Sequence, residues 1–300
     1  MSFIDKLKQC DCDLYENEPL SKHTTFRIGG PAKYFAVPRN LNAVKQLISA
    51  ARDNNVNFVI LGRGSNVLAA DEGFDGLVIR LSQKYANITV EGSTLYADAG
   101  ASLARICKIA LDNHLGGLEF AWGIPGSVGG AVYMNAGAYG GEMKDVVESV
   151  IYLDCEDGYN VKTLTAQECD FGYRHSFFAD KAHVICGVNF KLQHGSREEI
   201  KEKMDDLLNR RVTKQPYFIP SAGSTFKRPA GSYASMLVDQ CGLKGHAVGD
   251  AEVSPKHAGF VVNNGNASCA DVLQLCDEII AIVKEKTGFV LEREVKILGE

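Results

Sequence analysis

Two glycine-rich segments carry the residue types that could hold a phosphorylated ligand. Residues 62–66 read GRGSN and follow a short apolar run, so they would present backbone N–H groups, a hydroxyl and an amide at the end of a buried strand. Residues 123–141, GIPGSVGGAVYMNAGAYGG, contain seven glycines and no charged side chain. Missing side chains let backbone N–H groups approach a bulky anion closely. Two such segments together predict a site for a large phosphorylated cofactor.

Neither segment carries a complete nucleotide-binding motif. Residues 62–66 lack the third glycine of a GxGxxG fingerprint, and the GK[ST] sequence of a Walker loop is absent. Taken alone, residues 62–66 could equally form a tight turn that joins two strands. Residues 123–130 favour ligand binding over a simple turn, because they add backbone N–H groups that no large side chain covers. A pyrophosphate with an attached ring requires such groups.

The uncharged stretch from Phe120 to Gly141 has a second interpretation, a membrane helix. Gly126 to Gly130 forms the GxxxG pattern with which such helices pack. Pro125, Asn135 and the many glycines disfavour a helix, however, and no aromatic anchors flank the stretch. We therefore expect no membrane insertion.

Cysteines and histidines are dispersed along the chain. The nine cysteines include no CxxC pair, Cys10-Asp-Cys12 has no matching second pair, and the seven histidines form no HExxH motif. We therefore expect no metal site. Scattered thiols without a signal-peptide pattern indicate a cytoplasmic protein, and the net charge of −5 argues against a nucleic-acid partner. The sequence does not indicate the oligomeric state.

The elements that must position these segments alternate between helical and strand-like periods. The 300 residues, 45% of them hydrophobic, suit two domains with real cores. Residues 41–51 place Leu41, Val44, Leu47, Ile48 and Ala51 on one helical face, and a buried strand at 57–61 follows and ends in GRGSN. Further expected elements up to the second glycine-rich segment are strands at 76–82 and 87–100 and a helix from Ser102 to near Gly116.

The rest of the chain predicts strands and helices of similar kinds. Strands are expected within 146–164 and 183–193, and a polar-faced helix over 196–216 marks the candidate boundary between domains 1–193 and 194–300. Beyond it we expect a loop at 221–229, a helix near 232–241, a strand at 257–262, a last helix and a final strand at 289–298. Ser268 and Asp271 form a capping-box pattern for the last helix, and Gly288 can end it.

Six motifs, in this order, resemble the UDP-N-acetylenolpyruvoylglucosamine reductase family. They are HTTFRIGGPA at 23–32, LGRGSNVL at 61–68, GIPGSVGGAVYMNAGAYG at 123–140, FGYRHSFF at 171–178, AGSTFKRP at 222–229 and LEREVKILG at 291–299. The resemblance spans nearly the whole chain. It implies an α+β fold, with an FAD-binding domain of the PCMH (vanillyl-alcohol-oxidase) type followed by a smaller α+β substrate-binding domain.

The resemblance also implies an activity and three catalytic residues. The family reduces UDP-N-acetylenolpyruvoylglucosamine to UDP-N-acetylmuramate for peptidoglycan synthesis, with hydride passing from NADPH to FAD to the enolpyruvyl group. Ser224 occupies the position of the proton donor, and Arg174 that of the group that polarises the substrate carboxylate. Glu294 would stabilise or position the intermediate.

Binding residues follow from the same motifs. Residues 123–131 should face the FAD phosphates and ribityl chain, and residues 135–140 should lie nearer the flavin ring and the substrate. The expected FAD contacts are Gly62, Arg63, Gly64, Ser65, Asn66, Gly123, Ile124, Pro125, Gly126, Ser127, Gly129, Gly130, Ala131, Asn135 and Gly137. The expected substrate contacts are Tyr139, Tyr173, Lys214, Lys227 and Arg228.

Two departures from the family pattern concern the substrate. Arg228 stands where some members have asparagine, and the spacing between Arg174 and Ser224 leaves no room for the loop, with its tyrosine, of the longer class. The chain therefore resembles the shorter, type II class. Another PCMH-type FAD oxidoreductase, such as an alcohol or aldonolactone oxidase, and a non-catalytic nucleotide-binding protein are the alternatives. Residues 123–130 contain no histidine for covalent flavin attachment, which disfavours the oxidase.

Overall fold

The computed structural model describes residues 2–299, and the chain divides into two compact units. Unit 1 comprises the segment ending at Leu14, Phe35–Arg63 and Leu77–Arg210. Unit 2 comprises Tyr15–Tyr34, Gly64–Gly76 and the segment from Arg211 onward. Unit 2 therefore includes two short segments from the first third of the chain, and the predicted domain boundary between residues 193 and 194 stays a prediction.

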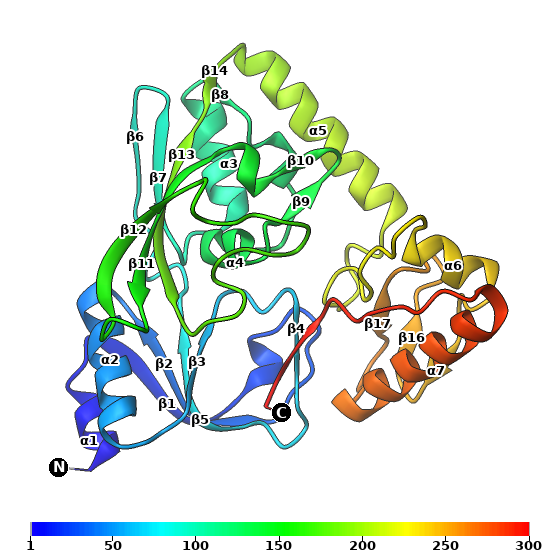
Figure 1. Cartoon of the computed structure of the whole chain (residues 1–300), viewed down its shortest axis with the longest axis horizontal. Coiled ribbons are helices and arrows are strands. Elements are labelled where there is room, and N and C mark those ends of the chain that lie inside the picture. The colour runs from blue at the N-terminus through cyan, green and yellow to red at the C-terminus, as the bar shows by residue number, and fades with distance from the viewer. Residues whose placement is uncertain (1, 300) are drawn as a thin grey trace. The chain divides into compact units, whose positions relative to one another are not determined.

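An antiparallel five-stranded sheet of order β12-β11-β13-β7-β6 forms the centre of unit 1 (Figure 1). Its strands are β6 (Ile88–Glu91), β7 (Thr94–Asp98), β11 (Val147–Asp154), β12 (Asn160–Thr165) and β13 (Val184–Lys191). The runs predicted at 87–100, 146–164 and 183–193 form these strands. Leu95, Val150 and Val188 are fully buried, so alternate side chains of the sheet build the core.

Helices and short strands complete unit 1. They are α1 (Phe3–Lys8), α2 (Leu41–Asp53), β3 (Phe58–Leu61), α3 (Leu103–Asp112), β8 (Leu115–Gly116), η2 (Glu119–Ala121), α4 (Val128–Tyr133), β9 (Gly137–Ala138), β10 (Gly141–Glu142), η3 (Met143–Asp145) and β14 (Gln193–His194). The predicted face of residues 41–51 is confirmed, because Val44, Leu47, Ile48 and Ala51 are buried. Asn40 caps this helix by accepting a hydrogen bond from the Ala43 N–H at 2.9 Å.

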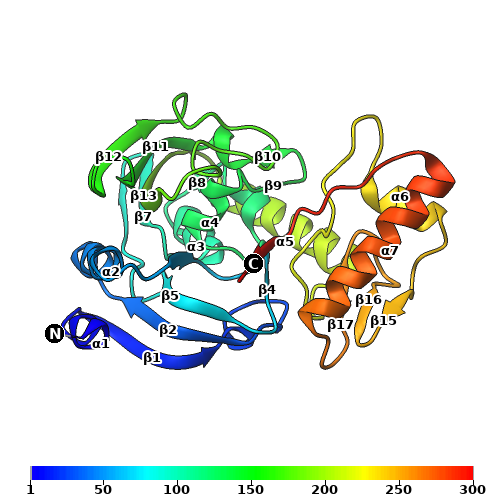
Figure 2. The ribbon, with the colours of Figure 1, turned by 60° about the horizontal axis from the view of Figure 1, so that its bottom comes forward.

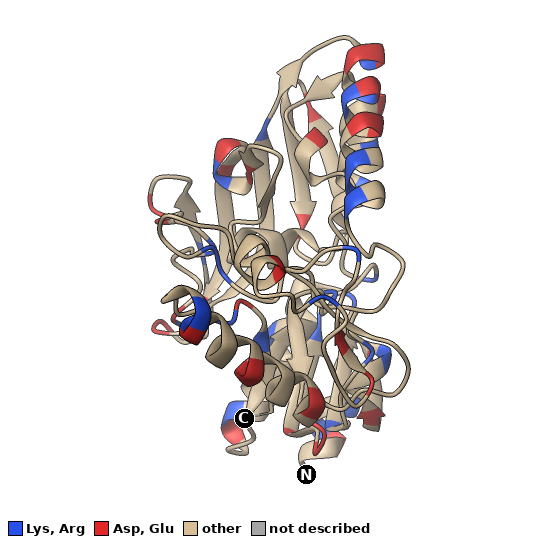
Figure 3. Ribbon diagram, turned by 90° about the vertical axis from the view of Figure 1, so that its right-hand side faces the viewer, with Lys and Arg blue, Asp and Glu red and all other residues tan. Residues whose placement is uncertain are grey.

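Four elements run across the division between the units. β1 (Cys12–Pro19), β2 (Pro31–Pro38) and β5 (Phe74–Arg80) each begin in one unit and continue into the other, and with β3 they form a sheet of order β1-β2-β5-β3. α5 (Arg197–Lys214) is the predicted polar helix. Figure 3 shows acidic and basic residues along its ribbon, and two ion pairs at helical spacing, Lys201 with Asp205 and Arg210 with Asp206, contribute to this pattern.

Unit 2 packs two helices against a small antiparallel sheet. Its elements are η1 (Leu20–Lys22), β4 (Val67–Ala69), α6 (Ala234–Gln240), β15 (Ala247–Val248), β16 (Ala251–Val253), β17 (Val261–Asn263), α7 (Cys269–Thr287) and β18 (Lys296–Leu298). Figure 2 shows α7 lying across the strands β15, β16 and β17. The predicted capping box of Ser268 and Asp271 is present, and Gly288 ends α7 with a φ of 77°.

The structure differs from the sequence prediction at two places near the candidate site. The predicted final strand over 289–298 is formed only by Lys296–Leu298, which pairs in parallel with β4. A helix was disfavoured throughout 123–141, yet Val128–Tyr133 forms α4. Its first N–H groups have partners, because Val128 N donates to Ala101 O at 2.8 Å and Gly129 N donates to Ala99 O at 2.9 Å. Within residues 2–299, every helix is too short or too polar to cross a bilayer.

Candidate active site

The start of the first glycine-rich segment contacts the second segment inside unit 1. Gly62 follows β3, and a Cβ built on it would lie 2.3 Å from the Oγ of Ser127. Ser127 is buried, and its Oγ caps α4 by accepting a hydrogen bond from Gly130 N at 3.4 Å. The glycine at position 62 therefore allows the chain after β3 to lie against the beginning of α4.

Several of these glycines are required for packing within the protein itself. A Cβ on Gly129 would lie 2.9 Å from the Cβ of Ala99, and one on Gly137 would lie 2.8 Å from the Cβ of Glu142. From the sequence, these glycines were predicted only to make room for the cofactor. In the structure they also let neighbouring backbone segments of unit 1 approach one another, and the FAD contacts expected from them stay predictions.

One buried donor beside the second segment fits an oxygen-rich ligand. The indole N–H of Trp122, directly before Gly123, is shielded from solvent and meets no acceptor among residues 2–299. A buried donor without a partner costs about 1–3 kcal/mol. An acceptor oxygen of a bound cofactor would remove this cost, so the residues present are compatible with a phosphorylated cofactor such as FAD.

Buried Asn135 connects the two turns that carry the predicted substrate residues of unit 1. Tyr139 and Gly140, both with positive φ, form the two-residue turn of the β9–β10 hairpin, and Tyr139 is exposed. Tyr173 and Arg174 form the tip of a second turn, which is closed by paired hydrogen bonds between Gly172 and His175.

The amide of Asn135 holds both turns. Its Nδ2 donates to Glu142 Oε2 at 2.6 Å and to Gly172 O at 2.9 Å, and its Oδ1 accepts from Lys144 N at 3.0 Å. Both amide hydrogens are therefore used inside the protein. Asn135 was predicted to contact FAD, and this contact stays a prediction that its backbone or the remaining lone pair of Oδ1 would have to make.

Arg174 itself has the left-handed backbone conformation, with a φ of 54°, and its guanidinium carbon lies 5.1 Å from the centre of the Tyr173 ring. A guanidinium that stacks on an aromatic face has the direction of its N–H edge fixed by the ring. Tyr173 is therefore a platform that orients the predicted carboxylate-binding side chain.

The predicted proton donor and the predicted carboxylate lie on neighbouring segments of unit 2. Glu294 N donates to Thr225 O at 2.8 Å, Phe226 and Arg293 form an antiparallel bridge, and Lys227 N donates to Glu292 O at 2.8 Å. Ser224 directly precedes this pairing and is half-buried, whereas the Glu294 residue is 8% exposed. The structure thus brings these two catalytic candidates together.

Two side chains that carried no predicted role in this pairing support it. Thr25 Oγ1 donates to Ser221 O at 2.7 Å, and Thr25 N donates to Gly64 O at 3.1 Å, so the HTTFRIGG motif joins two candidate loops. Asn66 Nδ2 donates to Glu294 O at 3.2 Å. Asn66 was predicted as an FAD contact, and its amide also holds the LEREV segment. Sequence separations of 196 and 228 residues explain why no local pattern indicated these bonds.

The remaining cationic candidates lie on the surface of unit 2. Lys214 is the exposed last residue of α5. Lys227 forms an ion pair with Glu292, and the guanidinium carbon of Arg228 lies 4.6 Å from the centre of the Tyr233 ring. Binding of a diphosphate by Lys227 would therefore require it to exchange one anionic partner for another.

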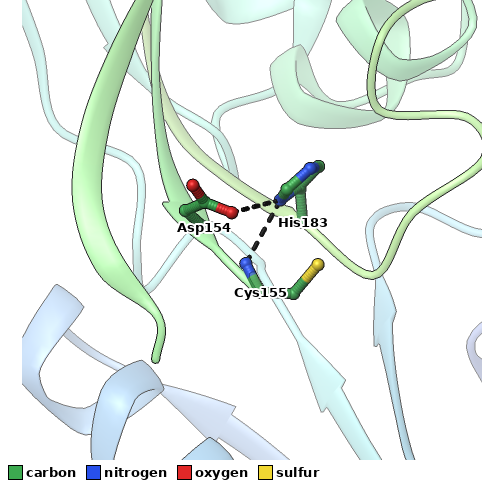
Figure 4. A group of neighbouring side chains, drawn as sticks. All are labelled: Asp154, Cys155 and His183. Carbon is green, nitrogen blue, oxygen red and sulfur yellow. Dashed lines mark hydrogen bonds and ion pairs between the residues drawn. The ribbon is translucent and has the colours of Figure 1, made fainter. Parts of the chain in front are cut away.

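Asp154, Cys155 and His183 form a cluster of metal-ligand types at the end of β11 (Figure 4). His183 Nδ1 accepts from Cys155 N at 3.2 Å and lies 3.2 Å from Asp154 Oδ1, while Lys162 Nζ donates to Asp154 Oδ2 at 2.7 Å. The hydrogen bond from Lys162 lowers the pKa of the Asp154 carboxyl. Asp154 Oδ2 and His183 Nδ1 thus have donors, whereas His183 Nε2 is buried without a hydrogen-bond partner among residues 2–299, and we assign the cluster to the packing of unit 1.

Two histidines, His183 buried and His257 partly buried, make stability depend on pH. Burial lowers the pKa of both His183 and His257, and each accepts a backbone N–H at Nδ1. The unfolded chain, with a histidine pKa near 6.5, therefore binds protons more readily than the folded chain. The contribution of these histidines to the free energy of unfolding should be constant above about pH 7 and fall as the pH drops below about 6.5.

Urea unfolding at a series of pH values checks this expectation. His183→Asn keeps an acceptor for Cys155 N and should reduce the loss of stability in acid, whereas His194→Asn, at an exposed position, should retain the full loss. An unchanged acid slope in His183→Asn would contradict the assignment.

The chain is similar to known proteins over nearly its whole length. Residues 32–163 match the FAD binding domain family, and residues 215–298 match the C-terminal domain of UDP-N-acetylenolpyruvoylglucosamine reductase. Proteins named UDP-N-acetylenolpyruvoylglucosamine reductase are similar over nearly their whole length. The one from Caldanaerobacter subterraneus subsp. tengcongensis is 49% identical over 99% of this chain and 98% of its own, and the one from Clostridium perfringens strain SM101 is 46% identical over 96% and 93%.

A crystal structure of a protein with the same name is also similar to this chain. The reductase of that name from Thermus caldophilus superposes with a TM-score of 0.81 at 35% identity, over 96% of this chain and 98% of its own. The predicted fold class, an FAD-binding domain followed by a smaller α+β domain, is confirmed by these matches.

Proposed function

The chain belongs to the UDP-N-acetylenolpyruvoylglucosamine reductase family of FAD-dependent oxidoreductases, and we propose that it reduces this substrate to UDP-N-acetylmuramate with NADPH as the reductant. The observation that carries the proposal is the 49% identity over 99% of the chain to a reductase of that name. The pairing of the Ser224 segment with the Glu294 segment supports it from the structure.

The reaction makes three demands on the protein. Reduction of an enol ether conjugated to a carboxylate requires hydride at one carbon and a proton at its neighbour, with negative charge between the two events. FAD, held by residues of 62–66 and 123–137, would supply the hydride chemistry when bound. The chain itself must then supply the proton, hold the carboxylate and stabilise the developing charge.

Ser224 suits the role of proton donor because its segment is held on one side by fixed neighbours. Thr225 N donates to Gly259 O at 2.9 Å, and Thr225 Oγ1 accepts from Val261 N at 2.9 Å. A general acid must be held within hydrogen-bond reach of the atom that it protonates. We propose that Ser224 Oγ protonates the enol intermediate and that buried Glu294 positions or stabilises that intermediate.

Arg174 would hold the substrate carboxylate through its planar fork of N–H groups. Tyr139 and Tyr173, exposed at the tips of the two turns joined by Asn135, are the proposed contacts to nucleotide or sugar. Lys214, Lys227 and Arg228 would contact the anionic groups of the substrate.

Arg174→Lys should lower kcat/KM by about 10–100-fold, because an ammonium cannot replace two parallel hydrogen bonds and a charge-assisted bond contributes about 1.5–3 kcal/mol. Steady-state NADPH oxidation with the UDP-linked substrate measures this loss. Arg52→Lys is the matched control, since the Arg52 guanidinium also lies over a tyrosine, at 5.3 Å from the Tyr159 ring centre. Near-normal kcat/KM in Arg174→Lys would count against carboxylate binding.

The purified protein tests the proposed function directly. We expect it to be yellow, to release FAD on acid denaturation and to oxidise NADPH faster when UDP-N-acetylenolpyruvoylglucosamine is added. Alcohol oxidation without response to the UDP-linked substrate would favour the oxidase alternative, and bound nucleotide without turnover would favour the non-catalytic one. A colourless protein that FAD cannot reconstitute would overturn the proposal.

We also infer that the reaction takes place in the cytoplasm. All nine cysteines are unpaired thiols in the structure, as expected for a reducing compartment. NADPH, the proposed reductant, must be available in the same compartment.

A further inference from the structure

Trp122 is the only tryptophan of the chain and lies between η2 and the second glycine-rich segment. The backbone on both sides of it is held by turns, because Trp122 N donates to Glu119 O at 3.2 Å and Ile124 N donates to Ala121 O at 3.0 Å. Its indole N–H, by contrast, is buried and meets no acceptor within the described range 2–299. A rigid backbone thus holds a donor that the protein does not satisfy.

Two tyrosine hydroxyls of unit 1 do have partners. Tyr96 Oη donates to Asp98 Oδ1 at 2.7 Å, and Tyr133 Oη, on α4, donates to Ala179 O at 3.0 Å. Buried tryptophan N–H groups normally find an acceptor as well. The indole can only donate, so what is missing at Trp122 is an acceptor from outside the chain.

We propose that Trp122 is an FAD-binding residue whose indole N–H donates a hydrogen bond to an oxygen of the bound cofactor. The inference rests on the FAD binding of the proposed function. We identify the ligand as FAD because Trp122 is adjacent in sequence to the segment expected to bind it. The phosphates, ribityl chain and flavin carbonyls of FAD also offer many acceptor oxygens.

A single tryptophan makes the proposal directly observable. In ¹⁵N-labelled full-length protein, one indole N–H resonance is expected, and it belongs to Trp122. Between the FAD-stripped and FAD-reconstituted protein this resonance should move downfield, and its exchange with solvent deuterons should slow. An indole resonance with the same position and the same exchange rate in both forms would overturn the proposal.

Trp122→Phe provides the second measurement, because it keeps an aromatic ring and removes the N–H. The dissociation constant of FAD, measured by quenching of flavin fluorescence, should rise roughly tenfold, which corresponds to about 1.4 kcal/mol. Tyr96→Phe is the matched control: it removes a hydroxyl that Asp98 already satisfies on β7, outside both glycine-rich segments, so FAD should bind as in the wild type. Equal affinity in wild type and Trp122→Phe would contradict the role of Trp122.

The two measurements separate this inference from the proposed function. A wild-type protein that binds FAD and reduces the UDP-linked substrate, but whose indole resonance does not respond to FAD, would refute only the role of Trp122. A wild-type protein that fails to bind FAD would refute both. If Trp122→Phe fails to fold, the resonance of the wild-type protein alone still decides the question.

Discussion

Replacing Ser224 with alanine should slow the reoxidation of the flavin by the enolpyruvyl substrate by roughly 10²–10⁴-fold and leave its bleaching by NADPH nearly unchanged. Only the second half-reaction requires a proton at carbon, so only that half should lose the contribution of a general acid. The fold should survive, because the contacts that fix the segment come from Thr225 and not from the Ser224 hydroxyl.

Anaerobic stopped-flow absorbance of the flavin measures the two half-reactions separately. Ser221→Ala is the matched control in the same loop, since Ser221 accepts the hydrogen bond of Thr25 through its backbone carbonyl, which alanine retains. Both phases should be near normal in that variant. Equal slowing of both phases in Ser224→Ala would show that the substitution disturbs the site as a whole, and the proton-donor role would be wrong.

Local features of the fold were predictable because they depend on residues close in sequence. The capping box of Ser268 and Asp271 and the left-handed Gly288 delimit α7 through bonds that span three or four residues. The buried face of α2 follows from helical periodicity in the same way. Such patterns need no knowledge of the rest of the chain.

The candidate site depended on long-range contacts that no pattern shows. Glycine propensity disfavoured α4, but Val128 N and Gly129 N find acceptors in the segment before α3, and this tertiary pairing outweighs propensity. The LEREV segment alternates like a strand, yet it pairs with the loop after Ser224 instead of extending β18. Family motifs indicated Ser224 and Glu294 as separate residues, and the structure supplies their proximity.

The assignment of chain segments to the two units is the largest feature that the sequence left open. Residues 15–34 and 64–76 belong to the same unit as the last third of the chain, although a linear division assigned them to the first domain. The hydrogen bond from Thr25 Oγ1 to Ser221 O explains this assignment, because it joins the segment around Thr25 to the Ser224 loop. Composition along the chain changes too little at such places to mark them.

Gly64→Ala is expected to have the largest effect on FAD content and stability. Gly64 has a φ of 63°, and a Cβ there would lie 2.4 Å from His23 O and 2.9 Å from Thr24 Cα, both backbone atoms that cannot rotate away. The loop would have to move, although Gly64 O accepts from Thr25 N, and nearby Asn66 holds Glu294. The free energy of unfolding should therefore fall by more than about 4 kcal/mol, beyond the usual range of a point substitution.

Gly92→Ala is the control that separates the effect of a steric clash from the effect of a left-handed backbone conformation. Gly92, in the turn between β6 and β7, has a similar φ of 57°, but a Cβ there would meet no atom within 4 Å, so alanine should cost only about 1–2 kcal/mol for the left-handed conformation. Flavin absorbance per protein and urea unfolding compare the two variants. Gly92→Ala should retain FAD and Gly64→Ala should lose it. Equal, small losses in both would mean that the loop at Gly64 yields easily and that its close approach to His23 does not shape the site.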